Sequence, residues 1–161
     1  MISSYGLHWK ADRVNWGKPG IGNPGTLLGA TSRSLKAHPV DFREQRGIYA
    51  LYAGYELVYV GQTGAGDDRL FKRLKEHRHD HLSERWDRFS WFGTQRKTKK
   101  NLLSADTKSI KNQSVKAALD IMEAVAIAIS EPKLNLQRGH WNNSTKFFQY
   151  GIRDKEENEE D

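Results

Sequence analysis

Residues 47–61 constrain the fold of this chain more than any other stretch. They hold two short runs rich in Ile, Leu, Val and Tyr, which are separated by Ala-Gly-Tyr at residues 53–55. This composition around a glycine-containing turn predicts a β-hairpin. Glycine stands at both ends, as Gly47 and Gly61, and lets the backbone bend sharply or approach another group closely. A ligand can therefore lie against either rim of the predicted hairpin.

The register of this hairpin decides where two tyrosines point. Side chains alternate between the two faces of a strand. A loop of two or four residues places Tyr49 and Tyr59 on opposite faces, whereas a three-residue loop or a bulge places them on the same face. If the two phenols share one site, the hairpin must have the odd register.

The charge of the chain is divided unequally. The sequence has 26 Lys and Arg against 20 Asp and Glu, a net charge of +6. Residues 154–161 hold six acids and one lysine, so their net charge is −5 and residues 1–153 carry +11. A basic body favours a polyanionic partner, although a solvated, charged surface explains the same composition. The acidic tail is expected to be disordered.

The composition also excludes several classes of protein. There is no cysteine, so the chain has neither disulfides nor a thiolate metal site. The longest apolar run, residues 124–129, is far too short to span a membrane. The N-terminal residues lack the pattern of a signal peptide. We therefore expect a cytoplasmic protein with no membrane partner.

A helix is expected soon after the hairpin. The apolar residues of RLFKRLKEHRH, at 69–79, recur at helical spacing, and Asp67-Asp68 is suited to cap the N-terminus of this helix. Arg73 and His77 are four residues apart, so they lie on one face, one turn from each other. An isolated pair of this kind is more often part of a solvated basic face than part of a site.

The second half of the chain adds a strand and a basic loop. Aromatic residues at 86–93 predict a third strand. Residues 95–114 are polar and basic and are expected to form a long loop. Loops of more than about 12–15 residues are usually functional or disordered, and both explanations fit this one.

A buried helix is expected at about 114–130. Between Ile121 and Ile129 every residue is apolar except Glu123, and a helix that is apolar all round is buried. A lone carboxylate there is costly unless it is paired or bound to a metal. Glu123 is thus either one member of a buried ion pair or a metal ligand or catalytic carboxylate.

Taken in order, these features resemble the GIY-YIG nuclease family. The resemblance covers about residues 47–135 and rests on GIY at 47–49, YVG at 59–61, Arg73 and His77 in LFKRLKEH, Glu123, and Asn135 after a proline. It implies an α+β fold with a small three-stranded antiparallel sheet flanked by helices. The expected organisation is an N-terminal extension at 1–45 packing on the domain, a nuclease domain at 46–152 and an acidic tail at 153–161.

The resemblance also implies a reaction, the metal-dependent hydrolysis of a DNA phosphodiester bond. Glu123 would bind one Mg²⁺ or Mn²⁺, ions that prefer oxygen ligands. Arg73 would neutralise charge on the phosphoryl oxygens. Tyr49 would orient or deprotonate the attacking water if Arg73 and the metal lower its pKa. Tyr59 and His77 would position water and phosphate or relay the proton, Asn135 would orient its neighbours, and whether tyrosine or histidine is the base stays open.

Three functions remain as alternatives. The first is an endonuclease of phage defence or restriction, the second a structure-specific repair or recombination nuclease, and the third an inactive DNA-binding module recruited by a partner protein. A recognisable second DNA-reading domain is absent from the sequence, which favours the first over the second. A homodimer or a partner protein is left open. The residues expected to contact DNA are basic: Arg69, Lys72, Arg96, Lys97, Lys99 and Lys100.

Overall fold

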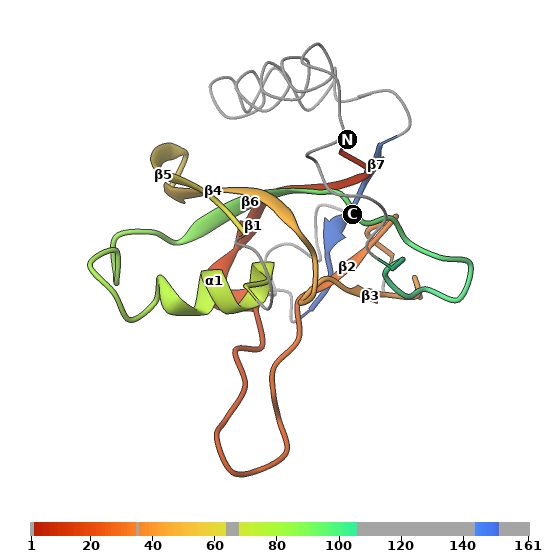
Figure 1. Cartoon of the computed structure of the whole chain (residues 1–161), viewed down its shortest axis with the longest axis horizontal. Coiled ribbons are helices and arrows are strands. Elements are labelled where there is room, and N and C mark those ends of the chain that lie inside the picture. The colour runs from red at the N-terminus through yellow and green to blue at the C-terminus, as the bar shows by residue number, and fades with distance from the viewer. Residues whose placement is uncertain (1, 35, 64–67, 106–143, 152–161) are drawn as a thin grey trace.

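The computed structural model describes residues 2–34, 36–63, 68–105 and 144–151 (Figure 1). A five-stranded mixed sheet has the strand order β5-β4-β6-β1-β7, and a smaller sheet has the order β3-β2-β8. The strands are β1 (Ser4–Lys10), β2 (Leu28–Ala30), β3 (Val40–Asp41), β4 (Gly47–Ala53), β5 (Glu56–Gln62), β6 (Arg88–Gly93), β7 (Thr145–Lys146) and β8 (Phe148–Gln149). The helices are the 3-10 helix η1 (Ala11–Arg13) and α1 (Leu70–Glu76).

The predicted hairpin is formed by β4 and β5, which pair antiparallel. β4 lies inside the sheet, between β5 and β6, and is covered on both faces. Tyr49 and Leu51 belong to the core on one face, and Ala50 and Tyr52 to the core on the other. This burial explains why the strand is a nearly continuous apolar run rather than an alternating one.

The first strand is an integral part of the central sheet. β1 pairs antiparallel with β6 and parallel with β7. Its register against β6 shifts between Gly6 and Trp9, and His8 has a φ of +52°. The side-chain alternation of β1 is therefore broken, which hides the strand in the sequence. Residues 1–45, expected as an extension on the domain, thus supply a strand of the domain's own sheet.

Aromatic residues fill the larger core, between the sheet and α1. The ring of Trp9 is 2% exposed and meets Trp91 edge to face, with 5.4 Å between the centroids. Phe42 packs against Trp91 from the smaller sheet's side, at 4.5 Å. The indole N–H of Trp9 donates to the carbonyl of Phe147. These contacts bind residues far apart in the sequence into one core.

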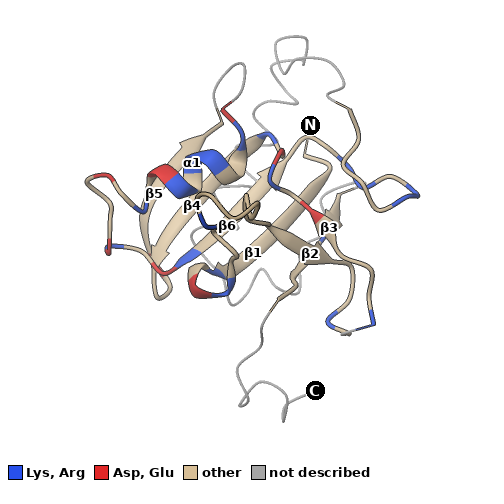
Figure 2. Cartoon of the chain, turned by 90° about the horizontal axis from the view of Figure 1, so that it is seen from below, with Lys and Arg blue, Asp and Glu red and all other residues tan. Residues whose placement is uncertain are grey.

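Helix α1 lies against one face of the central sheet, as Figure 2 shows from below. Its apolar residues Leu70, Phe71 and Leu74 are buried. The N-cap is Arg69, without a side-chain cap, so the expected capping by Asp68 is wrong. Asp68 instead accepts a hydrogen bond from Lys72 at 3.0 Å.

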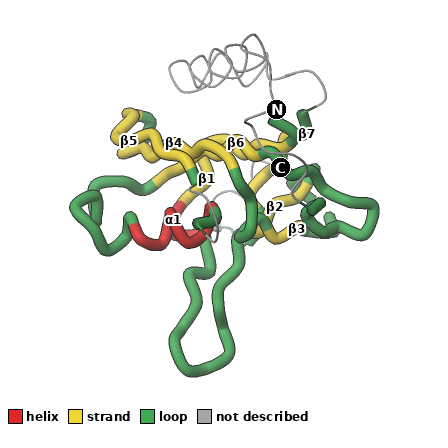
Figure 3. Tube along the Cα trace, viewed as in Figure 1, coloured by secondary structure: helices red, strands yellow, loops and turns green. Residues whose placement is uncertain are grey.

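The expected fold class, a three-stranded antiparallel sheet flanked by helices, is wrong. Strands predominate among the described residues, which contain a single α-helix (Figure 3). The sheet is larger than expected because β1 and β7 continue it beyond β6. β1 has no regular alternation and β7 has only two residues, so neither carries a readable strand pattern.

The helix expected at 114–130 and the acidic tail at 154–161 lie outside the described residues. Within the described ranges no helix has the length and apolar character needed to cross a membrane.

Candidate active site

Two tyrosines of the hairpin share one face of the sheet. Tyr49 pairs with Gly61, and Leu51 pairs with Tyr59. The register shifts between Leu51 and Tyr52, so the hairpin has the irregularity that a shared face requires. The centroids of the Tyr49 and Tyr59 rings are 6.2 Å apart. The odd register considered for this hairpin is therefore the observed one.

His77 reaches the two phenols from the C-terminal end of α1, where it is the C-cap. Its Nε2 lies 2.8 Å from the Tyr49 hydroxyl, and its ring centroid lies 4.9 Å from that of Tyr59. Only 3% of His77 is exposed. The indole N–H of Trp86 donates to the His77 carbonyl at 3.1 Å. The position of His77 is thus fixed through both its ring and its backbone.

Arg73 joins the cluster from one turn earlier in α1. Its guanidinium lies near the hydroxyl of Tyr49. Its Nη1 lies 2.7 Å from Oε2 of Glu76, and 28% of its side chain is exposed. Arg73 therefore lies beside the buried phenol and also faces solvent, where an anion can approach it.

The protonation of Tyr49 differs from the expectation. Burial raises the pKa of Tyr49 to about 12, although the nearby charge of Arg73 opposes this shift. Arg73 does lower this pKa, as expected, but desolvation raises it by more. Tyr49 is a neutral phenol at neutral pH, and its hydroxyl can donate to Nε2 of His77.

Asp80 is the one residue of the cluster that the sequence did not single out. Its Oδ2 lies 2.8 Å from Nδ1 of His77, and its Oδ1 accepts a hydrogen bond from the backbone N–H of Leu82 at 2.8 Å. The available signal is its position three residues after His77, which brings it back to the histidine where α1 ends. Hydrogen bonds thus join Tyr49, His77 and Asp80 in series, and Arg73 lies beside the Tyr49 end.

The two bracketing glycines have the close approaches expected of them. A Cβ on Gly61 would overlap the phenol of Tyr49 and would lie 2.8 Å from Cε1 of Tyr59. A Cβ on Gly47, whose φ is +153°, would overlap the carbonyl of Phe92. Gly61 therefore makes room for the tyrosine cluster, and Gly47 lets β4 approach β6.

Replacing Gly61 with alanine should destabilise the protein by about 1–3 kcal/mol, because the added methyl group must displace a buried phenol. We expect a lower melting temperature and a changed environment of Tyr49, measured by thermal denaturation and near-ultraviolet circular dichroism. The control is Gly54→Asn in the hairpin turn, where an added Cβ meets no atom within 4 Å and asparagine tolerates the φ of +61°. A Gly61→Ala variant as stable as the control would contradict this packing.

The residues expected to contact DNA lie in two separate places. Arg69 and Lys72 are on the first turn of α1, whereas the other four are exposed on the loop after β6. Figure 1 places this loop at the right-hand end of the long axis of the molecule and α1 to the left of its centre. The four loop residues are Arg96, Lys97, Lys99 and Lys100.

The described part of this loop, residues 95–105, is held in place by hydrogen bonds. An isolated bridge joins Lys97 to Leu103, and Thr98 donates its N–H to the Leu102 carbonyl at 2.7 Å. At its base, Gln45 donates to the carbonyl of Gln95 at 2.9 Å and accepts the Gln95 N–H at 3.0 Å. The buried Gln45 therefore ties the loop to the segment just before β4.

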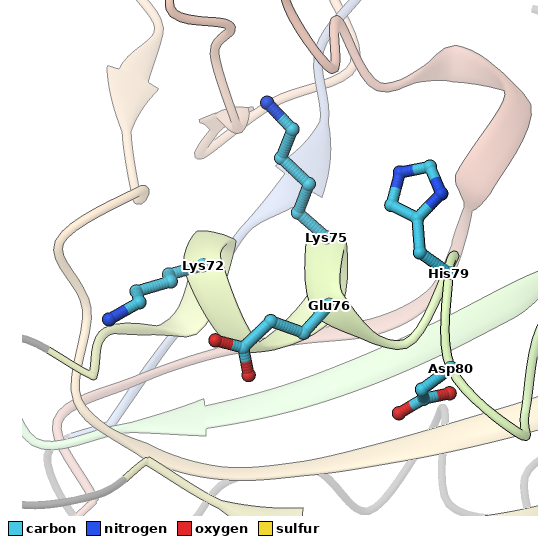
Figure 4. A pocket seen from close by; sticks show the side chains of 5 residues that line it. All are labelled: Lys72, Lys75, Glu76, His79 and Asp80. Carbon is cyan, nitrogen blue, oxygen red and sulfur yellow. The ribbon is translucent and has the colours of Figure 1, made fainter.

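The expected metal ligand Glu123 and the expected polar residue Asn135 lie outside the described residues. Within the described ranges, His, Cys, Asp and Glu form no group of three or more that could hold a metal ion. Glu76 and Asp80 line a shallow surface hollow with Lys72, Lys75 and His79 (Figure 4). Both carboxylates are already engaged, with Arg73 and His77 respectively. The described residues thus do not by themselves fit a divalent ion.

Comparison of the chain with protein-family models, with curated proteins and with solved structures finds no match.

Proposed function

We propose that this protein is a metal-dependent endonuclease that hydrolyses DNA phosphodiester bonds in the cytoplasm, in phage defence or restriction. The observation that carries the proposal is the hydrogen bond between Tyr49 and His77, with Arg73 and Tyr59 beside this pair. A partly exposed cation next to a phenol and an imidazole combines charge stabilisation with proton transfer, and phosphodiester hydrolysis needs both. The basic body of the protein suits a polyanionic substrate.

The exposure of each group suggests its role in this reaction. Arg73 and Tyr59 are partly exposed, so they meet the scissile phosphate and the attacking water. Tyr49 and His77 are buried and receive the proton that this water loses. Because Tyr49 is neutral, it accepts a proton only as it passes its own to Nε2 of His77. This assignment makes His77 the final base and Tyr49 the intermediate.

The metal dependence rests on Glu123, since the described residues alone do not fit a divalent ion. One Mg²⁺ or Mn²⁺ bound there would supply charge stabilisation of the leaving oxygen. The roles given to Arg73, Tyr49, Tyr59 and His77 do not depend on where the ion is bound.

The second candidate is a DNA-binding module without activity, recruited by a partner protein. The complete burial of Tyr49 favours it, because a phenol that is 0% exposed also suits a purely structural role. A structure-specific repair nuclease would use the same cluster on a branched substrate.

One experiment separates these functions. The protein is incubated with supercoiled plasmid, linear duplex and branched DNA, in Mg²⁺, in Mn²⁺ and in EDTA, and the cut ends are mapped. Cleavage of unmodified duplex supports the proposed function, and cleavage confined to branched DNA supports a repair nuclease. Binding without cleavage supports the inactive module. A mock purification from cells that do not make the protein shows whether a contaminating nuclease cuts the DNA.

The basic loop gives a separate prediction about DNA binding. Changing Lys97, Lys99 and Lys100 to glutamine should weaken binding and flatten its dependence on salt, by about one unit of slope for each phosphate that these lysines no longer neutralise. The measurement is the dissociation constant for duplex DNA over a range of salt concentrations.

The control for this prediction removes the same formal charge elsewhere. Lys18, Lys36 and Arg85 are exposed on three other loops, and their change to glutamine should leave most of the slope intact. An equal flattening in both triple variants would show that the loop contributes only net charge.

A further inference from the structure

The side chain of Asp80 is held through both of its oxygens. Oδ2 faces Nδ1 of His77 at 2.8 Å, and Oδ1 accepts the N–H of Leu82 at 2.8 Å. The side chain of Asp80 is 33% exposed, whereas that of His77 is 4% exposed. Leu82 itself packs in the aromatic core, so the anchor of the carboxylate is rigid. Asp80 therefore connects the buried imidazole to a fixed point of the backbone.

The charge of Asp80 decides which nitrogen of His77 carries the proton. Partial burial raises the pKa of Asp80, but the Leu82 N–H and the His77 imidazole lower it by more, so this pKa lies below its usual value. An ionised carboxylate only accepts hydrogen bonds, so Nδ1 of His77 must be the donor. In a neutral imidazole Nε2 is then the acceptor, and the Tyr49 hydroxyl donates to it.

The same end of α1 shows the same arrangement a second time. Glu76 holds the Arg73 guanidinium at 2.7 Å, just as Asp80 holds the His77 imidazole. Figure 4 shows the carboxylates of Glu76 and Asp80 on one side of α1 and Lys75 on the other. Arg73 and His77 are thus each paired with a separate carboxylate.

We propose that Asp80 is a positioning residue that fixes the tautomer and ring orientation of His77, so that Nε2 stays available to take the proton of Tyr49. The inference rests on the proposed function, since it concerns the base of that reaction. Asp80 does not contact the reacting atoms and acts through His77. When Nε2 accepts a proton, the carboxylate also stabilises the imidazolium that forms.

The test measures the tautomer directly, by NMR of the full chain with ¹⁵N-labelled histidine. The couplings between ring protons and ring nitrogens distinguish an Nδ1–H from an Nε2–H imidazole. We expect the Nδ1–H form of His77 in the unaltered protein. In Asp80→Asn we expect the Nε2–H form to appear, because the amide can donate to Nδ1.

Cleavage is measured on the same samples. Asp80→Asn should lower the cleavage rate by about 100-fold and leave DNA binding unchanged. The control is Glu84→Gln, an exposed carboxylate on the same loop, which should alter neither the tautomer nor the rate.

The two readouts separate failure of this inference from failure of the proposed function. An Nε2–H imidazole in the unaltered protein overturns the inference, whether or not the variant folds. So does an Asp80→Asn protein that keeps the Nδ1–H form or cuts at the full rate. If the tautomer behaves as expected while no DNA is cut, the positioning of His77 by Asp80 stands and the nuclease function fails.

Discussion

Alanine at position 73 is expected to lower the rate of DNA cleavage by about 10²–10³-fold while the protein stays folded. Arg73 is the partly exposed cation of the tyrosine cluster, so its removal takes away the charge that meets the phosphate. Stability should change little. Tyr49 keeps His77 as its acceptor, and the partly exposed pair with Glu76 contributes at most about 1 kcal/mol.

Two further variants serve as comparisons for Arg73→Ala. Arg73→Lys keeps the charge but loses the planar guanidinium, so we expect it to restore cleavage only in part. Arg85→Ala removes an exposed arginine on the loop after α1 and should cut normally. Cleavage rates and melting temperatures are compared across the three. A folded Arg73→Ala protein that cuts at the normal rate would remove Arg73 from the site.

The second large effect is expected at Glu123, which the sequence makes the lone charge between residues 121 and 129. If it holds the metal, Glu123→Gln should abolish cleavage while preserving folding and DNA binding, because no buried cation loses its partner. If it belongs to a buried ion pair, the same change should cost about 3–5 kcal/mol of stability. A thermal melt beside a cleavage assay decides between the two.

Metal titration sharpens this test. Cleavage by the unaltered protein should disappear in EDTA and return with Mg²⁺ or Mn²⁺. The control variant Glu131→Gln lies just beyond the predicted helix and should retain both cleavage and metal dependence. A folded Glu123→Gln protein that still cuts would exclude this residue as the essential ligand.

The sequence was most informative where the structure is local. The hairpin at 47–61 and the helix at 70–76 follow from composition and spacing over a few residues. The sequence showed that Tyr49 and Tyr59 can share a site only in the odd register. It could not show that the hairpin adopts this register. The register shift lies between Leu51 and Tyr52, within the paired strands, and the residue types there do not announce it.

The rest of the fold could not be predicted because it depends on pairing between segments that are far apart in the sequence. β1 needs β6 as its partner, and the pairing of Ser4 with Gly93 leaves no trace in either segment. The neutral state of Tyr49 depends on complete burial, which only the assembled core creates. The contact between Asp80 and His77 could not be predicted from the sequence, because a carboxylate at a helix end is usually solvated. The relative position of the basic loop and α1 is likewise a property of the whole fold.

The position of β1 between β6 and β7 has a consequence for the way the protein is made. Ribosomes deliver this strand before its neighbours, because β6 begins only at residue 88 and β7 only at residue 145. At about 5–20 residues per second, β1 waits seconds for its partners. During that time Tyr5 and Trp9, each 2% exposed in the finished protein, remain open to other nascent chains. The sheet therefore assembles late and through distant contacts, a topology that slows folding and favours assistance by chaperones.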